Sequence, residues 1–211
     1  MGLDLGDVDR QRTRHYSILK YMRDEWLDEL ESRLAPNESV AGLPQDLRRA
    51  AVLAVIYERD GQPVIPLIER TRGRGVHSGQ LALPGGGAEP ADRTLLETAL
   101  REAEEEISID TRELRVLGHL PPVQVRVSGF VVIPFVAWAE TPPMLVPNDA
   151  EVASIVHLAL SVVADPSLAR EIPNPPGSTH PVMYEYPLPE GRLWGATARM
   201  IHNLGTVLPP L

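Results

Sequence analysis

Short apolar runs rich in valine and isoleucine fill the middle of the chain, and turn residues separate them, a pattern that predicts strands. Residues 50–57 and 63–70 form the first pair, joined at Asp60-Gly61. Strands interspersed with helices predict a mixed-sheet α/β (α+β) sandwich. Further strands are expected at 113–120, 123–127, 130–138 and 153–158, and helices at 94–107 and 194–204.

The two ends of the chain depart from this pattern. Residues 1–36 are expected to form a helical extension that packs on the domain of residues 37–211, makes a homodimer contact, or stays a flexible arm. Between Pro166 and Pro189, seven of 24 residues are proline, which predicts a long ordered loop. The last helix is expected to end near Gly205. The apolar residues that predict the first helix, at spacings of three and four, are Leu19, Met22, Trp26, Leu27, Leu30 and Leu34.

Composition excludes several classes of protein. The 29 acidic residues outnumber the 20 basic ones, and the net charge of −9 disfavours nucleic acid as a partner. The absence of cysteine removes disulfides, zinc–thiolate sites and a thiol nucleophile. The longest apolar run, Phe130–Ala139, is too short for a membrane span and contains Pro134. With no signal peptide evident, a cytoplasmic location is expected.

The helix expected at 94–107 ends in a group of acids. At 100° per residue, Glu102, Glu105 and Glu106 share an arc of about 100° beside the apolar stripe. Each like-charge pair three or four residues apart opposes the helix by about 0.2–0.5 kcal/mol, and the helix C-terminus also disfavours anions. A divalent cation would offset this repulsion, and carboxylate oxygens favour Mg²⁺, Mn²⁺ or Ca²⁺.

Three glycines precede this helix. Pro84 is followed by Gly85, Gly86 and Gly87, whose backbone can approach a phosphate or a metal closely. Alone, a glycine turn or an acidic helix face is more often ordinary surface. Together, in one short segment, they indicate a metal and phosphate site.

This segment, LPGGGAEPADRTLLETALREAEEEISI, resembles the Nudix box, G-x5-E-x7-R-E-U-x-E-E-x-G-U, in which U is aliphatic. Arg93 stands at the first glutamate position and Ser108 at the second glycine position. Asp92 or Glu89 could replace the missing glutamate as a partner of the box arginine. Within this box, residues 87–109, the matching positions are Gly87, Arg101, Glu102, Ala103, Glu105, Glu106 and Ile109.

The flanking sequence is similar to the coenzyme A pyrophosphatase branch of that family. That branch carries L-L-T-x-R-[ST], then a histidine and G-Q-x-[AS]-F-P-G-G, from which Pro66, Ile68 and Leu83 depart. GFVVIPFVAW, Glu151-Val152 and WGATARMI also look like this branch, so the resemblance covers residues 50–205. The positions in register upstream are Leu67, Arg70, Thr71, His77, Gly79, Gln80, Ala82 and Pro84.

The resemblance implies a Nudix-type α/β/α sandwich and metal-dependent hydrolysis of a small molecule linked to a nucleoside diphosphate. Coenzyme A would give 3′,5′-ADP and 4′-phosphopantetheine. Mg²⁺ or Mn²⁺ is the implied cofactor, and Glu105 or Glu106 would also activate water. Arg101 would orient a box carboxylate, and Glu151 would be a distal acid. The implied metal ligands are Glu102, Glu105, Glu106 and a carbonyl of Gly85 or Gly86, and the implied substrate-binding residues are Arg70, Arg74, His77 and Gln80.

Two alternatives stay open. The first is a Nudix enzyme that acts on ADP-ribose, NADH, dinucleoside polyphosphates or nucleoside triphosphates. The second is a catalytically silent binding module of the same fold, which Arg93 alone supports because the acidic helix face is complete.

Overall fold

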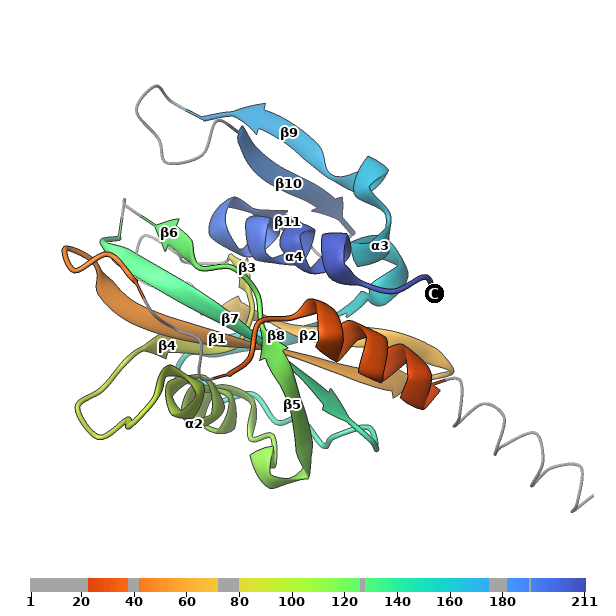
Figure 1. Cartoon of the computed structure of the whole chain (residues 1–211), viewed down its shortest axis with the longest axis horizontal. Helices are drawn as coiled ribbons and strands as arrows, with labels where there is room; N and C mark the ends of the chain where they lie inside the picture. The colour runs from red at the N-terminus through yellow and green to blue at the C-terminus, as the bar shows by residue number, and fades with distance from the viewer. Residues whose placement is uncertain (1–22, 38–41, 72–79, 126–127, 175–181, 190) are drawn as a thin grey trace, which may run out of the picture.

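Three layers form the centre of the structure, a computed structural model that describes residues 23–37, 42–71, 80–125, 128–174, 182–189 and 191–211 (Figure 1). A central sheet lies between helix α2 (Leu95–Ile107) on one face and helices α3 (Leu160–Ala164) and α4 (Gly195–Val207) on the other. Short 3₁₀ turns lie at Thr111–Glu113 and Pro166–Leu168. The predicted mixed α+β sandwich is confirmed. Within the described ranges, no helix is long and apolar enough to cross a membrane.

Strand β1 (Arg48–Arg59) is the centre of the sheet. It pairs antiparallel with β2 (Gln62–Arg70) and β4 (Gly85–Gly87), and parallel with β7 (Phe130–Ala139), so the sheet is mixed. The strand order is β3-β2-β1-β7-β5, with β8 beside β2 and β6 beside β7. The remaining strands are β3 (Leu81–Ala82), β5 (Leu114–His119), β6 (Val123–Val125) and β8 (Val152–Ala159).

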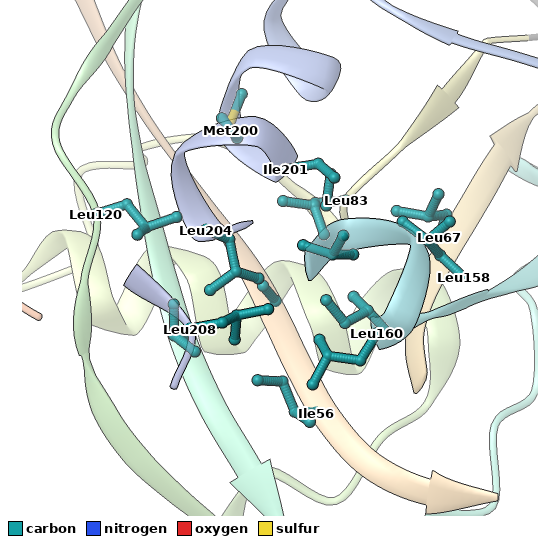
Figure 2. Packing of buried hydrophobic residues seen from close by; sticks show 14 of the residues in the cluster. Ile56, Leu67, Leu83, Leu120, Leu158, Leu160, Met200, Ile201, Leu204 and Leu208 are labelled. Atoms are coloured by element: carbon teal, nitrogen blue, oxygen red, sulfur yellow. The ribbon is translucent and has the colours of Figure 1, made fainter. Parts of the chain in front are cut away.

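The side chains of β1 alternate between two apolar clusters, as the period of two in a strand requires. Leu53 and Val55 pack toward α2, whereas Ala54 and Ile56 pack toward α3 and α4. Figure 2 shows the second cluster, in which Leu204 of α4 and Leu208 just after it lie near Ile56 and Leu160. Because both faces are buried, β1 is apolar along its middle, and the glycine strand β4 pairs with it over three residues.

The N-terminal helix, residues 23–33 in the described part, packs on the domain. Leu27, Leu30 and Leu34 are buried in the cluster that contains α4. Arg33 donates from Nη1 to the carbonyl of Leu208 at 3.0 Å, which ties this helix to the end of α4. Packing on the domain was one of the three expected arrangements. Two of the residues that predicted the helix, Leu19 and Met22, lie outside the described residues.

The prediction of a long loop between Pro166 and Pro189 is wrong, because two strands of a second sheet, β9 (Arg170–Pro173) and β10 (Val182–Leu188), lie in this segment. With β11 (Gly191–Trp194), they form this sheet in the order β11-β10-β9. Tyr184 and Tyr186 alternate with exposed or half-buried residues and pack against α4. Proline density was a poor guide because Pro173 ends a strand and Pro187 is exposed.

Helix α4 also differs from its expected end. It runs to Val207, so Gly205 lies inside the helix and not beyond it. A Cβ atom on Gly205 would lie 2.2 Å from the carbonyl oxygen of Val163. The glycine therefore allows the backbones of α3 and α4 to approach, which a helix-ending signal read from sequence alone does not reveal.

This contact predicts that Gly205→Ala destabilises the protein, although alanine is the better helix former. Overpacking against a backbone carbonyl should lower the free energy of unfolding by about 1–3 kcal/mol. Urea denaturation would measure it, with Thr206→Ala on the exposed side of the same turn as a control that changes little. A stabilised Gly205→Ala variant would contradict the prediction.

Candidate functional site

Helix α2, which carries the acidic residues, has a well-defined cap at each end. Thr94 caps its N-terminus by accepting a hydrogen bond from Glu97 N at 3.1 Å. Ser108 ends it in the left-handed conformation, with φ of 54°. That conformation favours glycine, so the structure explains why the box pattern has glycine there.

The glycines of β4 let the strand and the helix approach closely. Gly86 pairs with Ala51 of β1, and a Cβ atom on Gly86 would lie 2.5 Å from the carboxylate of Glu102. Gly85 has φ of 152°, and its Cβ would lie 2.3 Å from the carbonyl oxygen of Ala51. A larger residue at either position would push the strand off β1 or off α2. The glycine turn is therefore the packing surface for the acidic helix face.

Arg101 is held by a bidentate contact with Asp92. Its Nε and Nη2 atoms donate to Oδ1 and Oδ2 of Asp92, both at 3.1 Å. These hydrogen bonds hold the pKa of Asp92 well below its usual range. Glu89 lies 4.0 Å from Arg101, and Arg93 turns outward to Glu97. Of the two substitutes considered for the missing box glutamate, Asp92 is the one that contacts the arginine.

The same arginine reaches the acids of the helix face. Arg101 Nη1 lies 3.0 Å from both Glu102 Oε1 and Glu105 Oε2. The side chain of Glu105 is 57% exposed, whereas Glu102 is largely buried. Burial raises the pKa of Glu102, and Glu105 and Glu151 add to the effect, while Arg101 opposes it. The acids that share one arc of the helix therefore differ in exposure, and Glu105 is the one that faces solvent.

Glu106 is the buried acid of the group, with a side chain 2% exposed. Its Oε2 atom accepts a hydrogen bond from Gly85 N at 2.8 Å, and its Oε1 atom lies 3.4 Å from Arg70 Nη2. Burial raises its pKa to about 7; Glu102 and Glu151 contribute in the same direction, and Arg70 and the Gly85 hydrogen bond oppose them. Burial therefore outweighs the contacts with Arg70 and Gly85 N in setting the pKa of Glu106.

Glu151 joins the site through the connection between β7 and β8. Asn148 N donates to the carbonyl of Glu106, and Glu151 N donates to the carbonyl of Asn148, both at 2.9 Å. Thr71 N donates to the carbonyl of Glu151 at 2.9 Å. Asn148 also caps its own turn by accepting from Ala150 N at 3.2 Å. Asn148 is not among the residues predicted from the sequence, although the Asn-Asp pair just before Glu151 is a turn signal.

The substrate-binding residues expected upstream are only partly visible. Arg74 and His77 lie outside the described residues. Arg70 is described, but it contacts Glu106 and the carbonyl of Gly85, at 3.1 Å, and not an open anion site. The carbonyl of Gln80 accepts from Arg70 N at 3.2 Å, which fixes the end of β2.

The donors at this site fit a hard divalent cation, although the described residues hold no ready-made group of three acids or histidines close enough to bind one. Arginines hold the acids instead, with Arg101 on Glu102 and Glu105 and Arg70 on Glu106. The carboxylate of Glu106 is buried, and burial raises the pKa values of Glu102 and Glu106, so added positive charge would stabilise their ionised forms. Carboxylates with a nearby backbone carbonyl are the donors that Mg²⁺ and Mn²⁺ prefer.

Comparison with known proteins agrees with this geometry. Residues 47–173, more than half of the chain, match the NUDIX domain family. The chain is 37% identical over 163 residues to the Nudix hydrolase NudL of Photorhabdus laumondii, covering 77% of this chain and 86% of that protein. It is 38% identical over 160 residues to NudL of Pectobacterium atrosepticum, covering 74% and 81%.

Several solved structures of Nudix hydrolases also align with this chain. The Nudix hydrolase RenU of M. smegmatis aligns with a TM-score of 0.47 and 25% identity, over 62% of this chain and 81% of that chain. A MutT Nudix hydrolase from Burkholderia pseudomallei aligns with a TM-score of 0.44 and 21% identity, over 74% and 96%. On the family match and the NudL relatives, this chain belongs to the Nudix hydrolase family and is a pyrophosphohydrolase.

Proposed function

We propose that the chain hydrolyses coenzyme A, or a derivative of it, to 3′,5′-ADP and 4′-phosphopantetheine with Mg²⁺ or Mn²⁺. The observation that carries the metal-dependent part is the buried carboxylate of Glu106 beside Glu102 and Glu151, whose negative charges raise its pKa further. The diphosphate of the substrate is also anionic, so cations must lie between the two. A cytoplasmic location and a homodimer stay predictions of the sequence.

Each acid has a role in this proposal. Glu102, Glu105 and Glu106 would hold the metal with the carbonyl of Gly85, and Glu151 would complete the set from the far side. When bound, Mg²⁺ or Mn²⁺ supplies charge neutralisation at the diphosphate and lowers the pKa of a coordinated water. The water oxygen bonds to one phosphorus, the bridging P–O bond breaks, and Glu105 or Glu106 accepts the proton of the water.

Arg101 acts as a positioning residue. Its bidentate contact with Asp92 fixes the guanidinium, and its third nitrogen then holds the carboxylates of Glu102 and Glu105. Since Arg101 also donates to the carbonyl of Gly87 at 3.2 Å, one side chain joins the glycine strand, the loop before α2 and the helix face.

Support for coenzyme A comes from the upstream positions Arg70, Thr71 and Gln80, which lie at the end of β2 and the start of β3, beside the acids. A panel of coenzyme A, ADP-ribose and NADH at millimolar Mg²⁺ tests this choice. We expect coenzyme A to have the highest kcat/KM. Good turnover of ADP-ribose or NADH without cleavage of coenzyme A would reject it. Failure to cleave any nucleotide would favour a binding module.

The role of Glu106 predicts the effect of Glu106→Gln. Loss of residues that merely support metal ligands costs about 10–100-fold in affinity or activity, so loss of a ligand should lower kcat/KM by about 100-fold or more. Glu104→Gln is the matched control, because Glu104 lies on the same helix, is exposed, and bonds to Thr111. Steady-state assays and Mn²⁺ titration would measure both. Equal activity of the two variants would contradict the assignment.

The contact between Asp92 and Arg101 predicts that Asp92→Asn lowers the free energy of unfolding by about 1.5–3 kcal/mol at pH 7. The folded state depresses the pKa of Asp92, so its stabilising effect is present above the unfolded pKa, near 4, and fades as the pH falls below it. In urea denaturation, the difference in free energy of unfolding between the wild type and Asp92→Asn should therefore be larger at pH 7 than at pH 3.

Glu89→Gln is the control for Asp92→Asn, since Glu89 is exposed and 4.0 Å from Arg101. We expect a change within about 0.5 kcal/mol. A Glu89→Gln variant as destabilised as Asp92→Asn, or a difference that does not vary with pH, would show that Asp92 is not the partner that fixes Arg101.

A further inference from the structure

We propose that Arg70 is a built-in counter-ion that occupies the place of a metal ion in the metal-free protein, and that metal binding releases its guanidinium to bind the diphosphate of the substrate. The inference rests on the proposed metal site, and it changes the expected role of Arg70. This residue is then a movable link between metal loading and substrate binding.

The geometry places one nitrogen of Arg70 against two proposed metal ligands. Its Nη2 atom lies 3.1 Å from the carbonyl oxygen of Gly85 and 3.4 Å from Glu106 Oε1. The other oxygen of Glu106 is already taken by Gly85 N at 2.8 Å. A metal ion approaches such oxygens to about 2.0–2.6 Å, so it would compete with the guanidinium for the same two oxygens. The two positive charges would also repel each other at that distance.

The two arginines of the site are held very differently. Arg101 contacts both oxygens of Asp92 at 3.1 Å, and also the carbonyl of Gly87, and its side chain is 22% exposed. Arg70 approaches Glu106 at 3.4 Å, longer than a charge-assisted hydrogen bond, and is 35% exposed. The looser arginine is the one that covers the buried carboxylate. It can therefore move out while Arg101 stays.

Only the side chain of Arg70 needs to move. Its backbone N–H donates to the carbonyl of Gln80 at 3.2 Å, and the next residue, Thr71, donates to the carbonyl of Glu151. These bonds keep the base of the side chain beside the acids. A guanidinium displaced from Glu106 therefore remains next to the place where a diphosphate would meet the metal, and planar guanidinium groups bind phosphate oxygens well.

This arrangement predicts opposite effects of Arg70→Gln on two ligands. In calorimetry without nucleotide, the variant should bind Mn²⁺ about 5-fold or more tightly than the wild type, because the competing cation is gone. With Mn²⁺ saturating, it should bind methylenediphosphonate, a diphosphate analogue with no hydrolysable bridge, about 5-fold or more weakly.

Arg59→Gln is the control for the change in net charge. Arg59 lies at the opposite end of the β1–β2 pair, next to Gln62, and about 25 Å of strand separates it from Arg70. Screening at physiological salt makes its effect on Mn²⁺ small. Arg70→Lys keeps the charge but loses the planar fork, and its Mn²⁺ affinity should lie between those of the wild type and Arg70→Gln.

A spectroscopic readout tests the displacement directly in the wild type. The Nε–Hε signal of Arg70, assigned by its absence in Arg70→Gln, should shift when Mg²⁺ is added, whereas that of Arg101 should stay protected by Asp92. Unchanged or weaker Mn²⁺ binding by Arg70→Gln, or an unshifted Arg70 signal in a protein that binds metal, would overturn the inference alone. A wild type that binds no metal with or without nucleotide would instead overturn the proposed function.

Discussion

The hydrogen bond from Gly85 N to the buried carboxylate of Glu106 is the contact on which the site depends. It joins β4 to α2 and places a carboxylate where water cannot solvate it. That placement is costly unless positive charge is supplied, and Arg70 supplies it in part. The pairing of β4 with the central strand β1 keeps the donor in place, and the glycines of β4 make the approach of the helix sterically possible. The fold thus buries a carboxylate that a bound cation would stabilise.

The sequence was a good guide where local apolar runs or spacings decided the structure. Helix α2, the strands β1, β2, β5, β7 and β8 and the mixed sheet lie close to the predicted ranges, because helical apolar spacing marks α2 and short apolar runs bounded by turn residues mark the strands. Prediction from the sequence failed where it relied on the number of prolines or on one glycine instead of an apolar pattern. Proline density conceals the strands β9 and β10. Glycine near the end of an apolar pattern wrongly predicts the end of α4, because the contact of Gly205 with Val163 comes from tertiary packing.

Within the site, helical geometry predicted that Glu102, Glu105 and Glu106 are neighbours, but it could not predict which of them is buried. Burial depends on β4 and on the connection between β7 and β8, so Glu106 is buried and Glu105 is exposed although both belong to one arc. Likewise, choosing Asp92 over Glu89 as the partner of Arg101 required the path of the loop before α2. Family patterns name residue types, whereas the pairings among arginines and acids depend on the surrounding backbone.

The hydrogen bond between Asn148 N and the carbonyl of Glu106 sets a limit on how the β7–β8 connection can vary in length. Val146 N binds the carbonyl of Ile107 in the same way, so the chain from Val146 to Glu151 is registered on the end of α2. One extra residue after Val146 would shift Glu151 relative to Glu106. Graft designs that exchange this loop should therefore keep its last six residues intact.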